Sequence, residues 1–148
     1  MKKRLTAMTS ALCCALAFGC SAASQFQLSA KTPKQTVVQG EVVRVTVYTK
    51  NTGAPYEYLG SSTKIGAVAT LYTETDEGKY YLSAQPMAAT SDLRNVTIKH
   101  GEEIVAEWIF NVEADAVLGA YTLLLSYAED TVELSQFITV EKAETSAK

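Results

Sequence analysis

The chain contains no cysteine beyond residue 20. All three cysteines of the 148 residues, Cys13, Cys14 and Cys20, lie in its first twenty positions. A disulfide framework and a catalytic thiol are therefore excluded for the rest of the chain, whose stability must come from a packed core. His100 is the only histidine. Because no second histidine or later cysteine could complete a zinc site, we expect no metal and no cofactor.

Signatures of catalysis are also missing. No Gly-x-Ser-x-Gly element supports Ser-His-Asp chemistry, and His100 precedes Gly101 in what we interpret as a solvated turn. Acidic pairs such as Asp76-Glu77 and Glu129-Asp130 belong to separate turns without the spacing of a calcium loop. We therefore predict no catalytic residue and a protein that is not an enzyme.

The first nineteen residues have the pattern of an export signal. A basic cluster at residues 1–4 precedes an uncharged stretch from Leu5 to Phe18. That stretch is about 14 residues long, whereas a membrane-spanning helix needs about 20. We predict a signal peptide over residues 1–19.

The end of this signal, Leu16-Ala17-Phe18-Gly19-Cys20, resembles the lipobox of bacterial lipoproteins. The resemblance implies that Cys20 becomes an acylated N-terminus carrying palmitate-like chains, followed by a short tether at residues 20–25. Two or more acyl chains anchor a protein stably. We expect the protein at the outer membrane, facing the periplasm. The alternative is cleavage within residues 21–23, which would release a soluble periplasmic or secreted protein.

The net charge of the chain without its predicted signal peptide limits the classes of partner to be expected. Removing the three basic residues of the leader leaves ten basic and sixteen acidic side chains, a net charge of −6. Nucleic-acid binding, which needs a basic surface, is not expected. Electrostatic attraction to anionic lipid is not expected either, so the lipid on Cys20 is the predicted contact with the membrane.

Alternation of apolar and polar residues predicts an all-β fold. Val43, Val45 and Val47 alternate with polar residues over residues 42–50. The same period predicts strands at 26–31, 67–75, 79–85, 93–99, 104–112, 121–127 and 132–141. Residues 113–118 resemble a single helical turn, and residues 53–66 and 86–92 lack a pattern. We predict an immunoglobulin-like antiparallel β-sandwich over residues 26–142, with a flexible tail at 143–148.

A family resemblance supports this fold. Residues 93–102, Trp108 and the run Gly119-Ala120-Tyr121-Thr122-Leu123 are similar to bacterial immunoglobulin-like modules, the nearest being the BsuPI-type proteinase-inhibitor domain. The resemblance covers about residues 37–125. Physically, Tyr121 could form a tyrosine corner, and Trp108 is expected in the core with a partner for its indole N–H.

The segment from Asn51 to Ser62 is the candidate recognition site. It is rich in Tyr, Gly and Ser, which favours binding loops, and we predict that Tyr56, Tyr58 and Leu59 contact a partner. The other interpretation is that Tyr56 and Tyr58 begin an edge strand and pack on the sheet. Our leading hypothesis is a membrane-tethered binding or assembly module of the cell envelope, with an envelope protein as partner. The second is a proteinase inhibitor that inserts this loop.

Overall fold

The computed structural model describes residues 24–144, which form eleven strands and no helix. The predicted signal peptide, Cys20 and residues 145–148 lie outside the described residues. The strands are β1 (Phe26–Lys31), β2 (Thr36–Val38), β3 (Val42–Asn51), β4 (Tyr56–Gly60), β5 (Val68–Thr75), β6 (Gly78–Tyr81), β7 (Ser83–Ala84), β8 (Arg94–Ile98), β9 (Glu103–Asn111), β10 (Gly119–Tyr127) and β11 (Asp130–Glu141).

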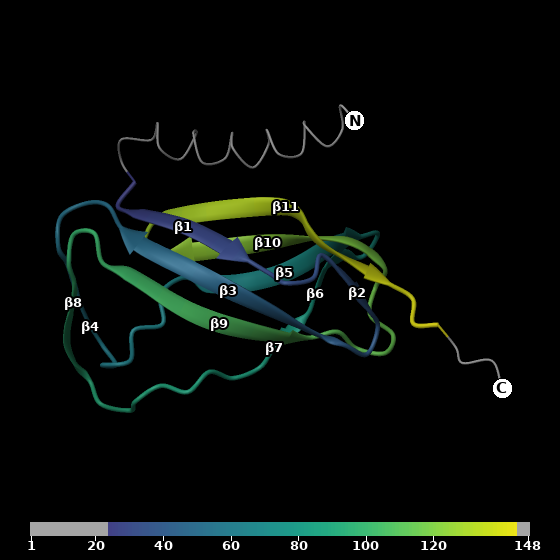
Figure 1. Ribbon diagram of the computed structural model, residues 1–148, viewed down its shortest axis with the longest axis horizontal. Helices are drawn as coiled ribbons and strands as arrows, with labels where there is room; N and C mark the ends of the chain where they lie inside the picture. Colours follow the sequence, from purple (N-terminus) through teal and green to yellow (C-terminus); the bar gives the residue numbers. More distant parts are fainter. Residues whose placement is uncertain (1–23, 145–148) are drawn as a thin grey trace.

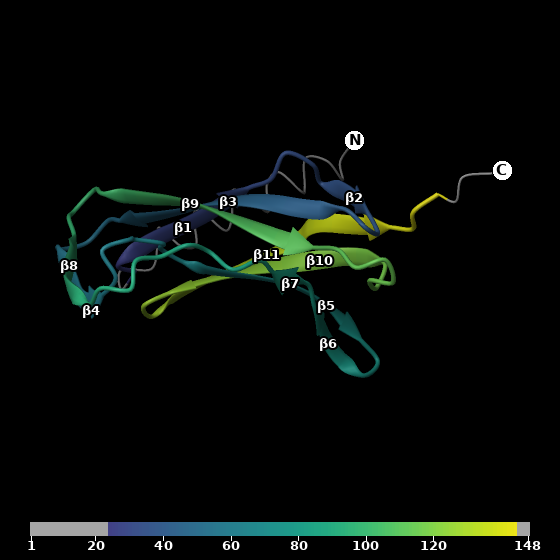
Figure 2. The ribbon, with the colours of Figure 1, turned by 90° about the horizontal axis from the view of Figure 1, so that it is seen from below.

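Two sheets pack face to face, as Figures 1 and 2 show. One has the order β1-β3-β9-β7 and the other β2-β11-β10-β5-β6. The chain leaves the first sheet after β1 and joins the second through β2, which pairs in parallel with β11. The remaining pairings are antiparallel. The predicted immunoglobulin-like sandwich is confirmed.

The core lies between the sheets because each long strand buries alternate side chains. Val43, Val45 and Val47 of β3 are at most 2% exposed, and they face Leu123 and Leu125 of β10, which are fully buried. A fully buried aliphatic side chain of this size contributes roughly 1.5–3 kcal/mol. The alternation of apolar and polar residues thus favours strands and also places the apolar side chains in the core that stabilises the two sheets.

Of the two predictions about aromatic residues, the structure confirms the one for Tyr121 and only part of the one for Trp108. The Tyr121 hydroxyl donates a hydrogen bond of 2.7 Å to the Val117 carbonyl, so the tyrosine corner is confirmed. Burial raises the pKa of this phenol well above its usual range. Trp108 packs against the core with its ring stacked on Phe110, at 6.3 Å between centroids. Its indole N–H, however, has no partner within residues 24–144.

Several elements differ from the sequence prediction. Strand β2 is too short for a period to show, and β4 lies in a stretch expected to be irregular. The strand predicted at 79–85 is two strands, since the chain passes from one sheet to the other at buried Leu82. Residues 113–118 form a single turn, in which the Ala116 N–H donates to the Glu113 carbonyl.

Strands β4 and β8 form a separate two-stranded antiparallel ribbon that belongs to neither sheet. Figure 1 shows this ribbon at the end of the sandwich where β1 begins. The β5–β6 hairpin and the end of β11 lie at the opposite end. The ribbon carries the candidate recognition residues and the entry of the chain lies beside it.

Candidate functional site

The chain enters the sandwich through a hydrogen-bonded clamp. The backbone N–H groups of Gln25 and Phe26 donate to the Asp130 carboxylate, over 3.1 and 2.8 Å. The Gln25 carbonyl accepts a bond from the Thr52 N–H at 3.0 Å. These contacts tie the first described residues to both the β10–β11 turn and the segment leading to β4.

Asn51 organises the same end of the molecule. Its side chain is fully buried, and its Nδ2 donates to the carbonyls of Ala54 and Ile98 over 2.9 and 2.8 Å. Its Oδ1 accepts bonds from Gln25 Nε2 and the Gly53 N–H. Every hydrogen-bonding group of the amide is therefore used, which joins the chain entry, the β3–β4 turn and the end of β8 in one network.

Tyr56 and Tyr58 face the sandwich. The Tyr56 ring packs edge-on against Phe26, with centroids 5.1 Å apart, and Phe26 packs likewise against Tyr127 at 4.7 Å. Tyr58 lies beside Tyr56 at 6.0 Å. Burial, with Tyr58 close by, raises the pKa of the Tyr127 phenol. Both candidate tyrosines begin a strand and pack on the core, as the second interpretation expected.

Leu59 points the other way. Because side chains alternate along β4, Leu59 lies on the outer face of the ribbon and is 63% exposed. It is opposite Asn95 of β8. Leu93, which stands immediately before β8 in the chain, is 70% exposed. The sequence prediction missed Leu93, because an apolar residue at a strand start reveals its face only once the pairing is known.

The ribbon is also held at its far end. The hydroxyls of Ser61 and Ser62 bond to the Thr90 hydroxyl, and Arg94 forms an ion pair of 2.6 Å with Asp92. The hydrogen bond from Thr90 is the main cause that lowers the pKa of the Asp92 carboxyl. The two irregular stretches that flank the ribbon are thus linked to each other.

Lys64 fastens the ribbon to the start of β9. Its Nζ donates to the Thr97 carbonyl at 2.9 Å and to Glu102 Oε2 at 2.8 Å. The hydrogen bond from Lys64 and one from the Lys99 N–H hold the pKa of the Glu102 carboxyl below its usual range. Together these contacts hold the ribbon in a fixed position against the rest of the sandwich.

His100 lies in the turn between β8 and β9. Its Nδ1 is 2.7 Å from the Gly53 carbonyl, so this nitrogen carries the hydrogen, and the side chain is exposed. Gly101 follows with φ +82°, a conformation open to glycine. Over residues 24–144 no three His, Cys, Asp or Glu side chains are grouped so that they could hold a metal ion.

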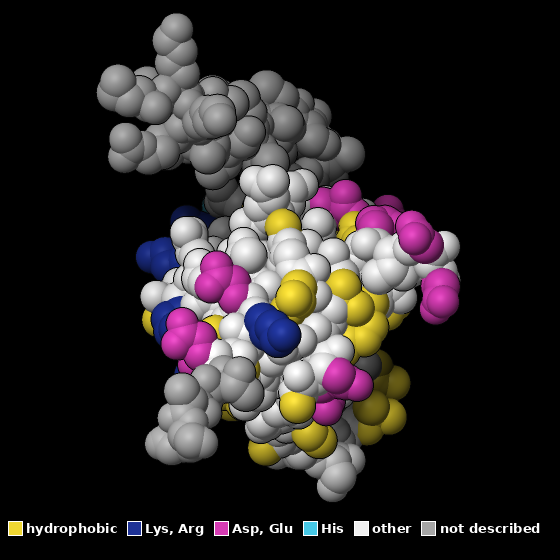
Figure 3. Space-filling model, turned by 90° about the vertical axis from the view of Figure 1, so that its right-hand side faces the viewer, with side chains coloured by type: hydrophobic (Ala, Val, Ile, Leu, Met, Phe, Trp, Pro, Cys, Tyr) yellow, Lys and Arg dark blue, Asp and Glu magenta, His cyan; other side chains and the backbone are white. Residues whose placement is uncertain are grey.

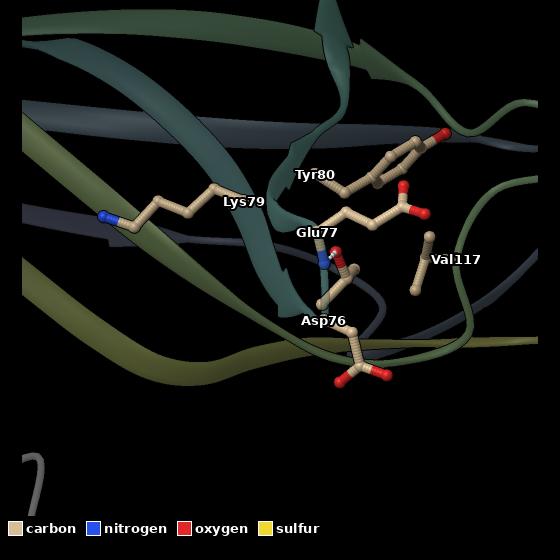
Figure 4. Close-up of a pocket in the computed structure, with 6 residues that line it drawn as sticks. Asp76, Glu77, Lys79, Tyr80 and Val117 are labelled. Atoms are coloured by element: carbon tan, nitrogen blue, oxygen red, sulfur yellow. Dashed lines mark hydrogen bonds between the residues drawn. The ribbon is translucent and has the colours of Figure 1, made fainter.

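A hollow lies at the opposite end of the sandwich, beside the β5–β6 hairpin. It has a volume of about 420 Å³ and is lined by Thr75, Asp76, Glu77, Lys79, Tyr80 and Val117. Figure 4 shows Lys79 directed away from the side on which Glu77 and Tyr80 lie. Figure 3, which views this end, shows several Asp and Glu side chains spread over the face, with a group of them at one margin. Burial and the nearby carboxylates of Asp115 and Glu113 raise the pKa of Tyr80. The polar groups do not converge on one point, and we assign no chemistry to the hollow.

No helix among residues 24–144 is long and apolar enough to cross a membrane.

Comparison with known proteins gives no family. No protein-family model and no curated protein matches the chain. Among solved structures, the alkylpurine DNA glycosylase AlkC of Pseudomonas fluorescens matches with 9% identity and a TM-score of 0.47, over 79% of this chain and 30% of that one. A β-glucosidase of Listeria innocua matches with 15% identity and a TM-score of 0.45, over 78% and 16% of the two chains. The sporulation control protein Spo0M of Bacillus subtilis matches with 16% identity and a TM-score of 0.46, over 80% and 50%. The chain spans at most half the length of these three proteins, and likeness at this level does not bear on activity.

Proposed function

We propose that this protein is a non-enzymatic binding module of the bacterial cell envelope, anchored by lipid on Cys20, whose partner is another envelope protein. The observation that carries the proposal is a pair of exposed leucines at the β4–β8 ribbon: Leu59 on the outer face of β4, 63% exposed, and Leu93 immediately before β8, 70% exposed. Large apolar side chains presented on a rigid support are typical anchors of protein interfaces.

The packing beneath this face of the ribbon also supports the proposal. Tyr56 and Tyr58 pack inward on the aromatic cluster, so the backbone of β4 is held in place and Leu59 is directed outward. A strand whose backbone is already ordered loses less conformational entropy when a partner binds. The tyrosines predicted to touch the partner thus act beneath the surface, while Leu59 stays in the predicted contact.

The position of the ribbon relative to the anchor also supports it. Four residues lie between Cys20 and Gln25, so the chain between these two residues can span at most about 18 Å. Gln25 is clamped at the ribbon end of the sandwich. An acylated Cys20 would therefore keep the ribbon close to the bilayer, and the partner is a protein that reaches the membrane surface.

Site-specific photo-crosslinking tests the proposal. A photoreactive residue in place of exposed Glu57, in the full chain in its own cells, should give a discrete protein adduct. The double variant L59S/L93S should lose this adduct, because both apolar anchors are gone. The matched control V68S/L118S removes two exposed apolar residues elsewhere, 54% and 48% exposed, and should retain it.

Equal adducts from both double variants, at equal melting temperatures, would place the contact somewhere other than the outer face of the ribbon. Failure to obtain any adduct at Glu57 would argue against a protein partner at this face.

The inhibitor alternative gains no support from the structure. It requires the segment from Asn51 to Ser62 to insert as a loop into a protease. Residues 56–60 of that segment are instead strand β4, paired along its length with β8.

A further inference from the structure

Strand β9 is open along most of one edge. It pairs with β3 over its whole length, from Glu103 to Asn111. On its other side, β7 covers only Phe110 and Asn111. The sheet therefore ends at β9 over the first two-thirds of the strand.

Three residues present their backbone groups at this open edge. The Ile109 carbonyl points away from β3, because it accepts a 2.7 Å hydrogen bond from the Gln85 N–H on the β7 side. Backbone groups alternate in direction along a strand. Glu103, Val105 and Glu107 thus direct their N–H and C=O groups the same way, and these groups have no backbone partner among residues 24–144.

The edge is open because the neighbouring strand in the sequence pairs elsewhere. Strand β8 is joined to β9 by a tight turn, closed by a hydrogen bond from the Glu102 N–H to the Lys99 carbonyl at 3.0 Å. Strands joined by such a turn commonly form a hairpin. Here β8 pairs with β4 instead, and Figure 1 shows the β7–β8 connection swinging away from the β9 edge.

We propose that the open edge of β9 binds an extended segment of a partner protein as an added strand, and that this segment is basic at two positions. Addition of a strand to a sheet edge is a common mode of peptide recognition, in which the backbone gives affinity and alternate side chains give specificity. The paired stretch is about five residues long, or roughly 17 Å.

The side chains at this edge define the chemistry of the segment. Glu103, Val105 and Glu107 lie on the same outer face, and Val105 is 56% exposed. A strand added here places its own side chains directly opposite these three. Opposite charges favour lysine or arginine against each glutamate and an apolar residue against Val105. Arg44 contacts Glu107 at 3.5 Å, but both are about half exposed, so this pair is weak and leaves the carboxylate accessible.

The same charges argue against a second copy of this chain. Two β9 edges paired antiparallel about Val105 would set Glu103 of each copy opposite Glu107 of the other. Like charges directly opposite one another destabilise a strand pair. A groove of about 170 Å³ next to Glu107, lined also by Gln85, Pro86, Met87, Ala88 and Ile109, offers room for a side chain of the added strand as it passes.

This surface is separate from the outer face of the ribbon, so either can fail without the other. The test uses the full chain purified in detergent micelles and a blocked, fluorescein-labelled heptapeptide, Thr-Lys-Thr-Val-Thr-Lys-Thr. A second peptide replaces both lysines with glutamate. Fluorescence anisotropy should show saturable binding of the lysine peptide and about fivefold weaker binding of the glutamate peptide. Hydrogen exchange over residues 103–108 should slow when the lysine peptide is bound.

Four variants test whether binding of the peptide is specific to the β9 edge. V105P removes an outward N–H without touching the β3 ladder and should weaken binding at least about tenfold, while V105T should bind as the unaltered chain does. E103K/E107K should invert the preference toward the glutamate peptide. L59S/L93S should leave peptide binding unchanged.

Three outcomes would overturn the proposal: no saturable binding of either peptide, equal binding by V105P and V105T, or an unchanged preference in E103K/E107K. Sedimentation that shows a dimer abolished by V105P would assign the edge to a second copy and overturn it as well.

Discussion

At the scale of single residues, Asn51 has the largest structural role among the polar side chains near the candidate surface. It is one of two buried polar residues in the described chain, and its amide joins three segments. We expect Asn51→Ala to lower the free energy of unfolding by about 3 kcal/mol, because the buried Ile98 carbonyl loses its donor and the Gly53 N–H and Gln25 Nε2 lose their acceptor. Asn95→Ala, at an exposed position of β8, should change it by less than about 0.5 kcal/mol. Urea denaturation compares the two, and equal midpoints would contradict the role given to Asn51.

Glu102 should make the stability depend on pH. Its pKa is lowered in the folded state by the hydrogen bond from Lys64. A lowered carboxyl pKa contributes stability above the unfolded pKa, and this stability is lost as the pH falls through the folded value. Glu102→Gln should therefore cost about 0.5–1 kcal/mol at pH 7, a small value because the pair is partly exposed, and nearly nothing at pH 2.

Denaturation at both pH values, with Glu57→Gln as an exposed control, measures this effect. A difference between Glu102→Gln and the unaltered chain that stays constant with pH would assign the loss to packing instead of charge.

At the scale of elements, the β4–β8 ribbon depends on its aromatic underside. Tyr56 contacts Phe26 edge-on, a geometry that adds about 0.5–1.5 kcal/mol to the burial of the ring. We expect Y56A/Y58A to lower the melting temperature by roughly 10 °C and to speed hydrogen exchange over residues 94–98. Leu59→Ala should leave both nearly unchanged. Equal melting temperatures for Y56A/Y58A and Leu59→Ala would show that the tyrosines do not stabilise the ribbon and would favour their role as partner contacts.

The loop that leads into β5 depends on a glycine for space as well as conformation. A Cβ on Gly66 would lie 2.6 Å from Thr49 Oγ1, a buried atom that accepts a hydrogen bond from the Ala67 N–H. Gly40 has a similar positive φ, +92° against +80°, but nothing within 4 Å of such a Cβ. Gly40→Ala should cost about 1 kcal/mol, from backbone strain alone, and Gly66→Ala about 3 kcal/mol. Thermal unfolding gives the difference, and equal losses would show that Thr49 moves aside freely.

At the scale of the whole molecule, the sandwich has two structurally different ends. The clamp on Gln25 and the ribbon share one end, and the β5–β6 hairpin lies at the other. If Cys20 is acylated as proposed, the ribbon end faces the bilayer. A fluorophore on Glu57→Cys should transfer energy to acceptors in vesicle headgroups more efficiently than one on Glu77→Cys.

Both labelled positions are exposed glutamates, so the chemistry of the two substitutions is matched. Equal transfer would refute this orientation. Cys20→Ala should move the protein to the soluble fraction, and a variant that stayed membrane-bound would mean that something other than the lipid holds it.

The sequence by itself determined the fold class and most of the core. Alternation along β3, β9 and β10 identifies inward side chains without knowledge of their partners, because neighbouring residues of a strand point to opposite faces. The tyrosine corner was also predictable from the sequence, because Tyr121 and Val117 are four residues apart and their contact is local. The absence of cysteine after residue 20 likewise needs no structure to be interpreted.

Only the tertiary structure decided which strands pair. Strand β8 could have paired with β9 through its tight turn, yet it pairs with β4, and this choice turns Tyr56 and Tyr58 inward and leaves Leu59 outside. The same choice opens the β9 edge at Val105. A strand shows its period in its own sequence, but its partner and register depend on residues far away in the chain, so the candidate surfaces could not be located from the sequence.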